Sequence, residues 1–219
     1  MTAISNIHLE ILSDSQRALL DKLAPLVKGY TLAGGTALAL QLTHRRSYDF
    51  DFFSAKPLAR GLLGRLTQTV SVKKKSVDSA DELTVFNADE IKVTFLHYPF
   101  KNQYPLIYTE SGLSLYGVKD IAIQKAYTIG RRGEYRDYFD LYCIIKGGYC
   151  SLGEIIGGAQ EVYGGSFNDR IFLEQLVYFG DIADFAIEPV GKESVASLSE
   201  VKRFFEGLVK GFVKGTTEA

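Results

Sequence analysis

Two observations predict an α+β protein, mixed in its first half and helical in its second. Up to about residue 116, short strand-like runs rich in aromatic and β-branched residues are interleaved with helical segments. From residue 117 onward, the apolar residues recur at helical spacing. A length of 219 residues supports one or two domains. We therefore expect an α/β core over residues 1–116 and a helical domain over residues 117–219.

Composition excludes several classes of protein. Hydrophobic residues make up 46% of the chain and charged residues 23%, which is typical of a globular protein and not of a disordered one. The net charge of −1 excludes a protein that coats nucleic acid with a basic surface. Two cysteines cannot form a disulfide framework, and no apolar run approaches the roughly 20 residues of a membrane helix. Without a recognisable signal peptide, we expect a soluble cytoplasmic protein.

The first half reads as alternating helices and strands. Helices are predicted at 13–27, where Ser13 can cap the first turn, and at 36–42 and 58–69. Strands are predicted at 30–33, 48–53, 70–77, 83–87 and 91–97. The short stretch Ala88-Asp89-Glu90 predicts a tight hairpin between the last two strands, and prolines frame a loop at 99–105. The basic run at 73–75 fits a solvated edge strand, with contact to an RNA backbone as the alternative.

The second half is predicted to be helical throughout. Apolar spacing indicates helices at 118–129, 135–146, 152–162, 169–179 and 198–213. The apolar face of the last helix suits packing into a core, and docking of a partner is the alternative.

A glycine turn stands between the first strand and the helix that follows it. Gly34 and Gly35 allow backbone N–H groups to approach a ligand closely, and Thr36 adds a hydroxyl donor. The start of a helix favours a bound anion. By itself, the pattern also fits an ordinary turn.

Two aspartates alternate on the strand that follows. Asp49 and Asp51 share a face, because alternate side chains of a strand point the same way. Tyr48, Phe50 and Phe52 are then expected on the other face. Crowded carboxylates repel one another, and a divalent cation such as Mg²⁺ removes that cost. An amphipathic strand with its acids in water is the alternative.

The helical half contributes a second polar group. On a helix over 118–129, Lys125 lies within an apolar stripe, either extending its ammonium to water or directing it at a triphosphate. Asp137 and Asp140, three residues apart, share one face of the next helix. For these acids the structural alternative is a surface ion pair between Arg136 and Asp140.

These motifs together resemble a known family. The stretches LAGGTALAL, HRRSYDFDFF and DIAIQKAYTIGRRGEYRDYFDLY resemble the AbiEii/AbiGii (MenT-like) toxins of the DNA polymerase beta nucleotidyltransferase superfamily. The resemblance covers roughly residues 30–146. It implies a polymerase-beta-like mixed sheet with flanking helices, followed by a helical bundle that completes the active-site cleft.

The resemblance also assigns roles to residues. It implies that Asp49 and Asp51 hold Mg²⁺ and that Lys125 contacts the nucleotide phosphates, while Asp137 is the catalytic carboxylate of the helical half and Asp140 a weaker candidate. The phosphate-binding residues are then Gly34, Gly35 and Thr36, with Arg46 and Ser47 close by.

The implied activity is transfer of a nucleoside monophosphate from an NTP to an acceptor hydroxyl. The resemblance implies a toxin that modifies the 3′ end of tRNA and is neutralised by a cognate antitoxin. Addition of AMP to proteins, and a non-catalytic nucleotide-binding role, remain alternatives. The sequence does not identify the NTP, the acceptor or the oligomeric state.

One position departs from the wider superfamily, which often places a third carboxylate on a later strand. The matching stretch here is IKVTFL, and Thr94 holds the apolar-flanked position. Either two carboxylates suffice or another acid supplies the function. We expect Thr94 to share the face of Asp49 and Asp51, with Ile91, Val93 and Phe95 buried on the other face.

Overall fold

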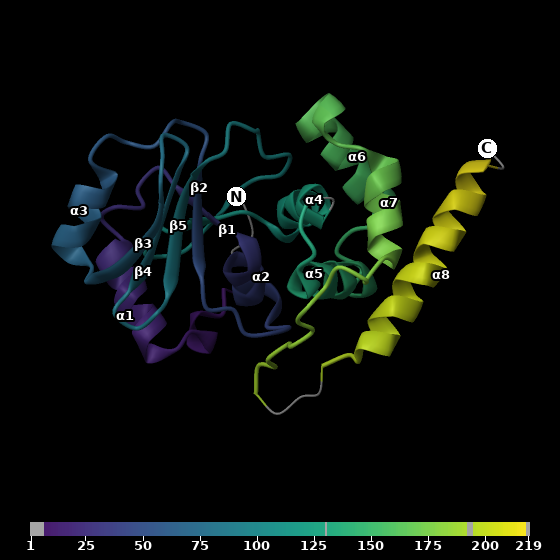
Figure 1. Cartoon of the computed structure of the whole chain (residues 1–219), viewed down its shortest axis with the longest axis horizontal. Coiled ribbons are helices and arrows are strands. Elements are labelled where there is room, and N and C mark those ends of the chain that lie inside the picture. The colour runs from purple at the N-terminus through teal and green to yellow at the C-terminus, as the bar shows by residue number, and fades with distance from the viewer. Residues whose placement is uncertain (1–6, 130, 192–194, 218–219) are drawn as a thin grey trace. The chain divides into compact units, whose positions relative to one another are not determined.

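The computed structural model describes residues 7–129, 131–191 and 195–217 (Figure 1). The chain divides between Gly117 and Val118 into two compact units. We call residues 1–117 the N-terminal unit and residues 118–219 the C-terminal unit, and describe each separately. In the described part of the chain, no helix combines the length and the apolar character that crossing a membrane requires.

A seven-stranded mixed sheet forms the described core of the N-terminal unit (Figure 1). Its spatial order is β3-β4-β5-β2-β1-β7-β6. The central strand β2 runs antiparallel to β1 and parallel to β5. The strands are β1 (Thr31–Ala33), β2 (Phe50–Ser54), β3 (Val72–Asp78), β4 (Glu82–Asn87), β5 (Lys92–His97), β6 (Ile107–Tyr108) and β7 (Ser114–Leu115). The predicted mixed sheet is confirmed, whereas the two short strands β6 and β7 were not predicted.

One face of this sheet forms a hydrophobic core. The register places Leu32, Phe52, Phe95 and Leu83 side by side on four adjacent strands. None of these side chains is more than 2% exposed, and the rings of Phe52 and Phe95 stack with centroids 5.5 Å apart. Because side chains alternate along a strand, the row displaced by one residue must lie on the opposite face.

Among the described residues of this unit, three α-helices accompany the sheet: α1 (Asp14–Leu23), α2 (Gly34–Leu42) and α3 (Leu62–Thr69). Ser13 and Gln16 form a capping box at the start of α1. The helix ends at Leu23, four residues before the predicted limit of 27, since Pro25 has no N–H to donate to the preceding turn. Similarly, α3 begins only after Gly61, whose φ of 71° is left-handed.

Two strand predictions in this unit need comment. The strand predicted at 48–53 begins only at Phe50, so Tyr48, which was predicted on the same strand face as Phe50 and Phe52, lies outside the strand and is 44% exposed. The basic run lies on β3, which is an edge strand. Lys73 and Lys75 pair with Glu90 and Asp78. These pairs favour the solvated edge over an RNA contact.

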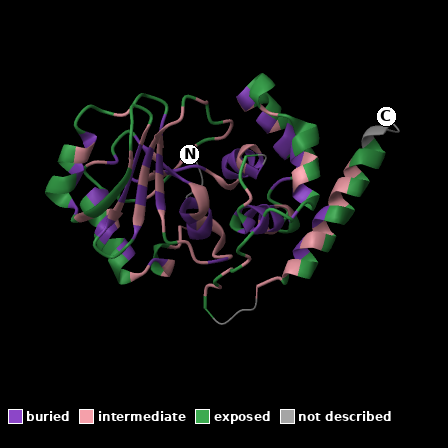
Figure 2. Ribbon diagram, in the orientation of Figure 1, coloured by how far each residue is buried: buried purple, intermediate pink, exposed green. Residues whose placement is uncertain are grey.

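The C-terminal unit is helical in its described residues, as predicted. Its helices are α4 (Val118–Ile129), α5 (Tyr135–Lys146), α6 (Leu152–Tyr163), α7 (Asp169–Val177) and α8 (Leu198–Thr217), with a short 3-10 turn at Gly164–Ser166. Helix α4 packs against α5, α6 and α7. Figure 2 shows α4 and α5 as mostly buried. Val201 and Phe205 of α8 are fully buried, which confirms core packing for this part of the helix.

Candidate active site

The polar face of the sheet carries the second aspartate of the predicted pair. Ala33, Asp51, Thr94 and Thr84 lie side by side on β1, β2, β5 and β4, opposite the hydrophobic core. Ile91, Val93 and Phe95 are buried. The prediction that Thr94 shares the face of Asp51 is therefore confirmed.

The carboxylate of Asp51 lies directly against the glycine turn. A Cβ added to Gly34 would stand 2.6 Å from Asp51 Oδ2, and Gly34 has a left-handed φ of 66°. Backbone conformation and close approach thus both favour glycine at this position. Folding brings the glycine turn and the second aspartate, separated by 16 residues in the sequence, into one place.

The side chains of an arginine and a serine pack against Gly35. A Cβ here would stand 2.5 Å from Arg45 Nη2 and 3.0 Å from Ser47 Oγ. The hydroxyl of Thr36 contacts Ser47 Oγ at 2.9 Å and also the backbone oxygen of Asp49. A positive guanidinium and two hydroxyls therefore surround the start of α2, where backbone N–H groups and the helix dipole favour an anion.

Arg45 was not predicted as a site residue, whereas its neighbour Arg46 was. The guanidinium of Arg45 is buried beside Gly35 and donates to the backbone oxygen of Arg46 at 2.9 Å. The guanidinium of Arg46 reaches the backbone oxygen of Ile11 at 3.3 Å. No local pattern distinguishes two adjacent arginines, since only the course of the loop decides which one faces the turn.

Asp49 precedes β2 and forms an ion pair with Lys92 of β5, with Nζ and Oδ2 3.1 Å apart. Lys92 lies two residues before Thr94, so this carboxylate lies on the Asp51 side of the sheet. Two carboxylates offer the hard oxygen donors that Mg²⁺ prefers, and they fit such an ion chemically. Within the described residues, no three His, Cys, Asp or Glu side chains form a ready metal cluster.

We expect Gly34→Ala to reduce nucleotidyl transfer by at least about a hundredfold, because misplacing a reacting group by an ångström costs that much. The new methyl group would displace the Asp51 carboxylate. Gly29→Ala is a matched control: Gly29 has a φ of 88° but nothing within 4 Å of an added Cβ. Both variants introduce left-handed strain, and only Gly34→Ala adds a clash. Equal activities of the two variants in a steady-state assay would contradict this account.

Thr94 gives a second prediction. Thr94→Ala should lower the transfer rate far less than Asp51→Ala, because a neutral hydroxyl contributes a hydrogen bond worth about 1 kcal/mol. Thr94→Asp should preserve or strengthen Mg²⁺ binding, since it adds a carboxylate beside Asp51. The three variants are compared by Mg²⁺-dependent transfer and by Mg²⁺ titration. A Thr94→Ala protein as inactive as Asp51→Ala would contradict a site with two strand carboxylates.

In the C-terminal unit, Lys125 is held by two carboxylates. Its Nζ lies 2.6 Å from Asp137 Oδ1 and 2.7 Å from Asp140 Oδ2, and Arg132 Nε lies 3.1 Å from Asp137 Oδ2. The side chain of Lys125 is 7% exposed, and those of the two aspartates are 3% and 0% exposed. An extended lysine with its ammonium in water, and a surface pair of Arg136 with Asp140, are both excluded. Arg136 lies 3.5 Å from Glu134 instead.

The buried triad of Lys125, Asp137 and Asp140 perturbs the titration of Asp137. Burial by itself would raise the pKa of Asp137, but the charges of Lys125 and then Arg132 outweigh it. The pKa of this carboxyl therefore lies below its ordinary value of 3.8. Asp137 stays ionised at neutral pH, as a group that positions a cation or accepts a proton must.

The sign of this shift predicts an acid dependence of stability. A depressed folded-state pKa stabilises the fold above the unfolded value and loses that contribution as pH falls through the folded value. The melting temperature of the wild type should therefore fall below about pH 4, and more steeply than that of Asp137→Asn. The difference between the two melting curves from pH 6 to pH 3 isolates this carboxyl. Parallel curves would contradict the assignment.

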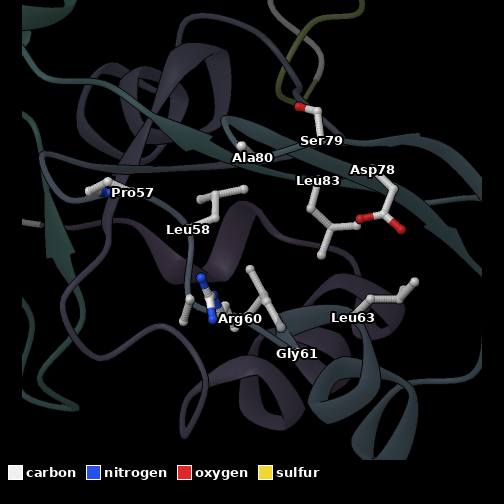
Figure 3. Close-up of a pocket in the computed structure, with 11 residues that line it drawn as sticks. Pro57, Leu58, Arg60, Gly61, Leu63, Asp78, Ser79, Ala80 and Leu83 are labelled. Atoms are coloured by element: carbon white, nitrogen blue, oxygen red, sulfur yellow. The ribbon is translucent and has the colours of Figure 1, made fainter.

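A separate hollow lies near the β3–β4 turn (Figure 3). It has a volume of about 510 Å³ and is lined by residues 57–63, 78–80 and Leu83. Arg60 and Asp78 are its ionisable residues, and it includes none of the predicted site residues. The candidate active site at the glycine turn is therefore separate from this hollow.

Comparisons with known proteins identify the family of this chain. The family described as "Nucleotidyl transferase AbiEii toxin, Type IV TA system" matches residues 17–186. An uncharacterised protein of Aquifex aeolicus is 32% identical over 212 residues, which span 93% of this chain and 98% of that protein.

Solved structures show the same fold at low identity. MenT4, a nucleotidyltransferase toxin from Mycobacterium tuberculosis, is 16% identical with a TM-score of 0.60, over 90% of this chain and 82% of that one. A structure described as a putative nucleotidyltransferase from H. pylori is 17% identical with a TM-score of 0.55, over 94% and 98% of the two chains. The α+β nucleotidyltransferase fold predicted from the motifs is therefore confirmed. The chain belongs to the AbiEii family of nucleotidyltransferase toxins of type IV toxin–antitoxin systems.

Proposed function

We propose that this enzyme transfers a nucleoside monophosphate from an NTP to an acceptor hydroxyl in a Mg²⁺-dependent reaction, and that the acceptor is the 3′ end of tRNA. The observation that carries this proposal is the packing of Asp51 against Gly34, with Arg45 and Ser47 against Gly35. A carboxylate for a cation and a positive, hydroxyl-lined helix start for phosphates thus adjoin one another. This is the combination that a metal-bound triphosphate requires.

Each residue then has a role in binding the triphosphate. The backbone N–H groups of Gly35 and Thr36 and the hydroxyl of Ser47 bind phosphate oxygens, and Arg45 and Arg46 balance their charge. Asp49 and Asp51 hold Mg²⁺, which, when bound, supplies charge stabilisation to the attacking and leaving oxygens. Lys92, which pairs with Asp49, offsets the repulsion of the two acids.

We propose that Lys125 and Asp137 take part in the transfer reaction. An ammonium can stabilise the charge on the transferring or leaving phosphates, and a carboxylate can orient or deprotonate the acceptor. The ammonium of Lys125 keeps the pKa of the Asp137 carboxyl below its ordinary value, so this carboxylate stays charged. The effect of substituting them on transfer, argued in the Discussion, tests this role.

The proposed partners follow from family membership. A toxin of a toxin–antitoxin system implies a cognate antitoxin, and a nucleotidyltransferase implies an NTP substrate. The tRNA acceptor is proposed from the resemblance in the sequence motifs. With a net charge of −1, the chain can offer RNA only local positive surface.

One labelling experiment tests the reaction and the acceptor together. The protein is incubated with each α-labelled NTP, Mg²⁺, total RNA and cell lysate, with Asp51→Ala as the inactive control. We expect label from one or more NTPs at the 3′ end of tRNA, dependent on Mg²⁺ and absent with the variant. Label in the protein fraction would indicate that the acceptor is a protein and not tRNA. Label in neither fraction for all four NTPs would favour a non-catalytic nucleotide-binding role.

A further inference from the structure

We propose that four aromatic side chains beside Asp51 bind the nucleobase of the NTP by stacking. They are Phe53, Tyr98, Phe100 and Tyr116, and we call them the aromatic cluster. This inference rests on the proposed nucleotidyl transfer and adds a base-binding site to the phosphate and cation sites described above. The aromatic cluster belongs to the N-terminal unit, as do Asp51 and the glycine turn.

Phe53 lies on the polar face of the sheet. It follows Asp51 by two residues on β2, so the two side chains point to the same face. Phe50 and Phe52 on the opposite face are fully buried, whereas Phe53 is partly exposed. Phe53 therefore does not belong to the hydrophobic core that Phe50 and Phe52 help to form.

Three further rings gather around Phe53. Its ring centroid lies 4.9 Å from that of Tyr98 and 6.2 Å from that of Tyr116, and the ring of Phe100 lies 5.1 Å from that of Tyr98. The backbone N–H of Tyr98 donates to the last residue of β2 at 2.7 Å, and that of Tyr116 donates to β1 at 3.0 Å. The segments that follow β5 and β7 are thus held against the sheet. Because Tyr98 and Phe100 are also partly exposed, the aromatic cluster presents ring surface to a ligand.

The order of groups along β2 matches the order of the parts of an NTP. Strand β1 runs antiparallel to β2, with Ala33 opposite Asp51 and Thr31 opposite Phe53. The glycine turn follows Ala33 directly, so along the strand it lies on the side of Asp51 that is away from Phe53. A phosphate-binding turn, a cation ligand and an aromatic ring therefore follow one another. Asp51 and Phe53 are about 7 Å apart along the strand, a length that the ribose between α-phosphate and base can span.

The chemistry of the aromatic cluster suits a nucleobase. Every base has a flat π-face, and aromatic side chains bind such faces by stacking with little dependence on sequence. The terminal base of an acceptor RNA is the other source of such a ring. The NTP is favoured because the aromatic cluster and the glycine turn flank the same carboxylate, that of Asp51.

A tryptophan reporter tests base binding without catalysis. The chain contains no tryptophan, so Phe53→Trp places a single indole within the aromatic cluster. At least one of the four NTPs, titrated with Mg²⁺, should quench its fluorescence, because a stacked base quenches indole. Tripolyphosphate with Mg²⁺ carries the phosphates without a base and should cause much less quenching. Tyr149→Trp is the matched control, since Tyr149 is 47% exposed and lies past the end of α5 that is remote from Asp137, and no NTP should quench it.

Phe53→Leu measures the contribution of the ring. The substitution should raise the Kd of the quenching NTP about tenfold in calorimetric titrations, which is the size expected for one base stacked on an aromatic ring. The Kd of tripolyphosphate should stay within about twofold of the wild-type value. Leucine keeps apolar volume at this position, so the comparison isolates the ring. Melting temperatures show that both variants of Phe53 are folded.

The outcomes separate this inference from the proposed function. It is overturned if no NTP quenches Phe53→Trp and Phe53→Leu binds NTPs with wild-type Kd. Quenching by tRNA alone would also overturn it, because the base would then belong to the acceptor. Equal losses of affinity for NTP and tripolyphosphate in Phe53→Leu would overturn it as well, because the phosphate site would then be disturbed. Label transfer by the wild type would leave the proposed function standing in each case, whereas quenching by an NTP without transfer to any acceptor would support the base site and contradict the proposed function.

Discussion

Replacing Asp51 with alanine should abolish nucleotidyl transfer and leave the fold intact. Asp51 is the strand carboxylate that lies against Gly34, so its loss removes a proposed Mg²⁺ ligand, which costs several kcal/mol of transition-state stabilisation. Its loss also removes one of two neighbouring negative charges, so stability should stay the same or rise slightly. Transfer is measured with the labelled NTP, and stability by thermal unfolding.

Asp49→Ala should also abolish transfer, with a small difference in stability. Asp49 forms an ion pair with Lys92, and both side chains are about one-third exposed. Breaking such an exposed pair costs at most about 1 kcal/mol. Asp78→Ala on β3 is a suitable control, because Asp78 forms a comparable exposed pair with Lys75 outside the site. An active Asp51→Ala protein, or one that unfolds, would contradict the assignment of the carboxylates.

Lys125→Met should have the largest effect on stability and should also abolish transfer. The substitution removes the ammonium between Asp137 and Asp140, whose side chains are 3% and 0% exposed. Removing one member of a buried ion-paired group costs about 3–5 kcal/mol, because it leaves buried charge uncompensated. Urea unfolding measures the loss, and the transfer assay at a temperature where the variant is folded measures activity.

A triple variant separates the structural from the catalytic role of this lysine. Lys125→Met combined with Asp137→Asn and Asp140→Asn removes all three charges of the triad. It should recover most of the lost stability, because neutral groups of similar shape replace a buried ionic group at little cost. Transfer should remain absent if Lys125 and Asp137 act on the nucleotide. A stable triple variant with wild-type activity would reduce the triad to a structural role.

Periodicity and local turn chemistry predicted most of the secondary structure. The helices expected at 118–129 and 135–146 have those limits in the structure, because each is a long amphipathic segment with clear breaks on both sides. The alternation of acids and aromatics likewise predicted which face of β2 is buried from Phe50 onward. The predicted helix limits were wrong where a proline or a glycine ended or delayed a helix despite continued apolar spacing, as at Pro25 and Gly61.

By itself, the sequence determined the family, the order of the elements and which residue types carry the chemistry, since motifs and periodicity are properties of neighbouring residues. Only the tertiary structure decided that Arg45 rather than Arg46 packs on Gly35, and that Lys125 joins two buried aspartates. It also aligned Thr84 and Thr94 with Asp51, a relation set by strand register. Register and burial depend on pairing between distant segments, which spacing along one segment does not encode.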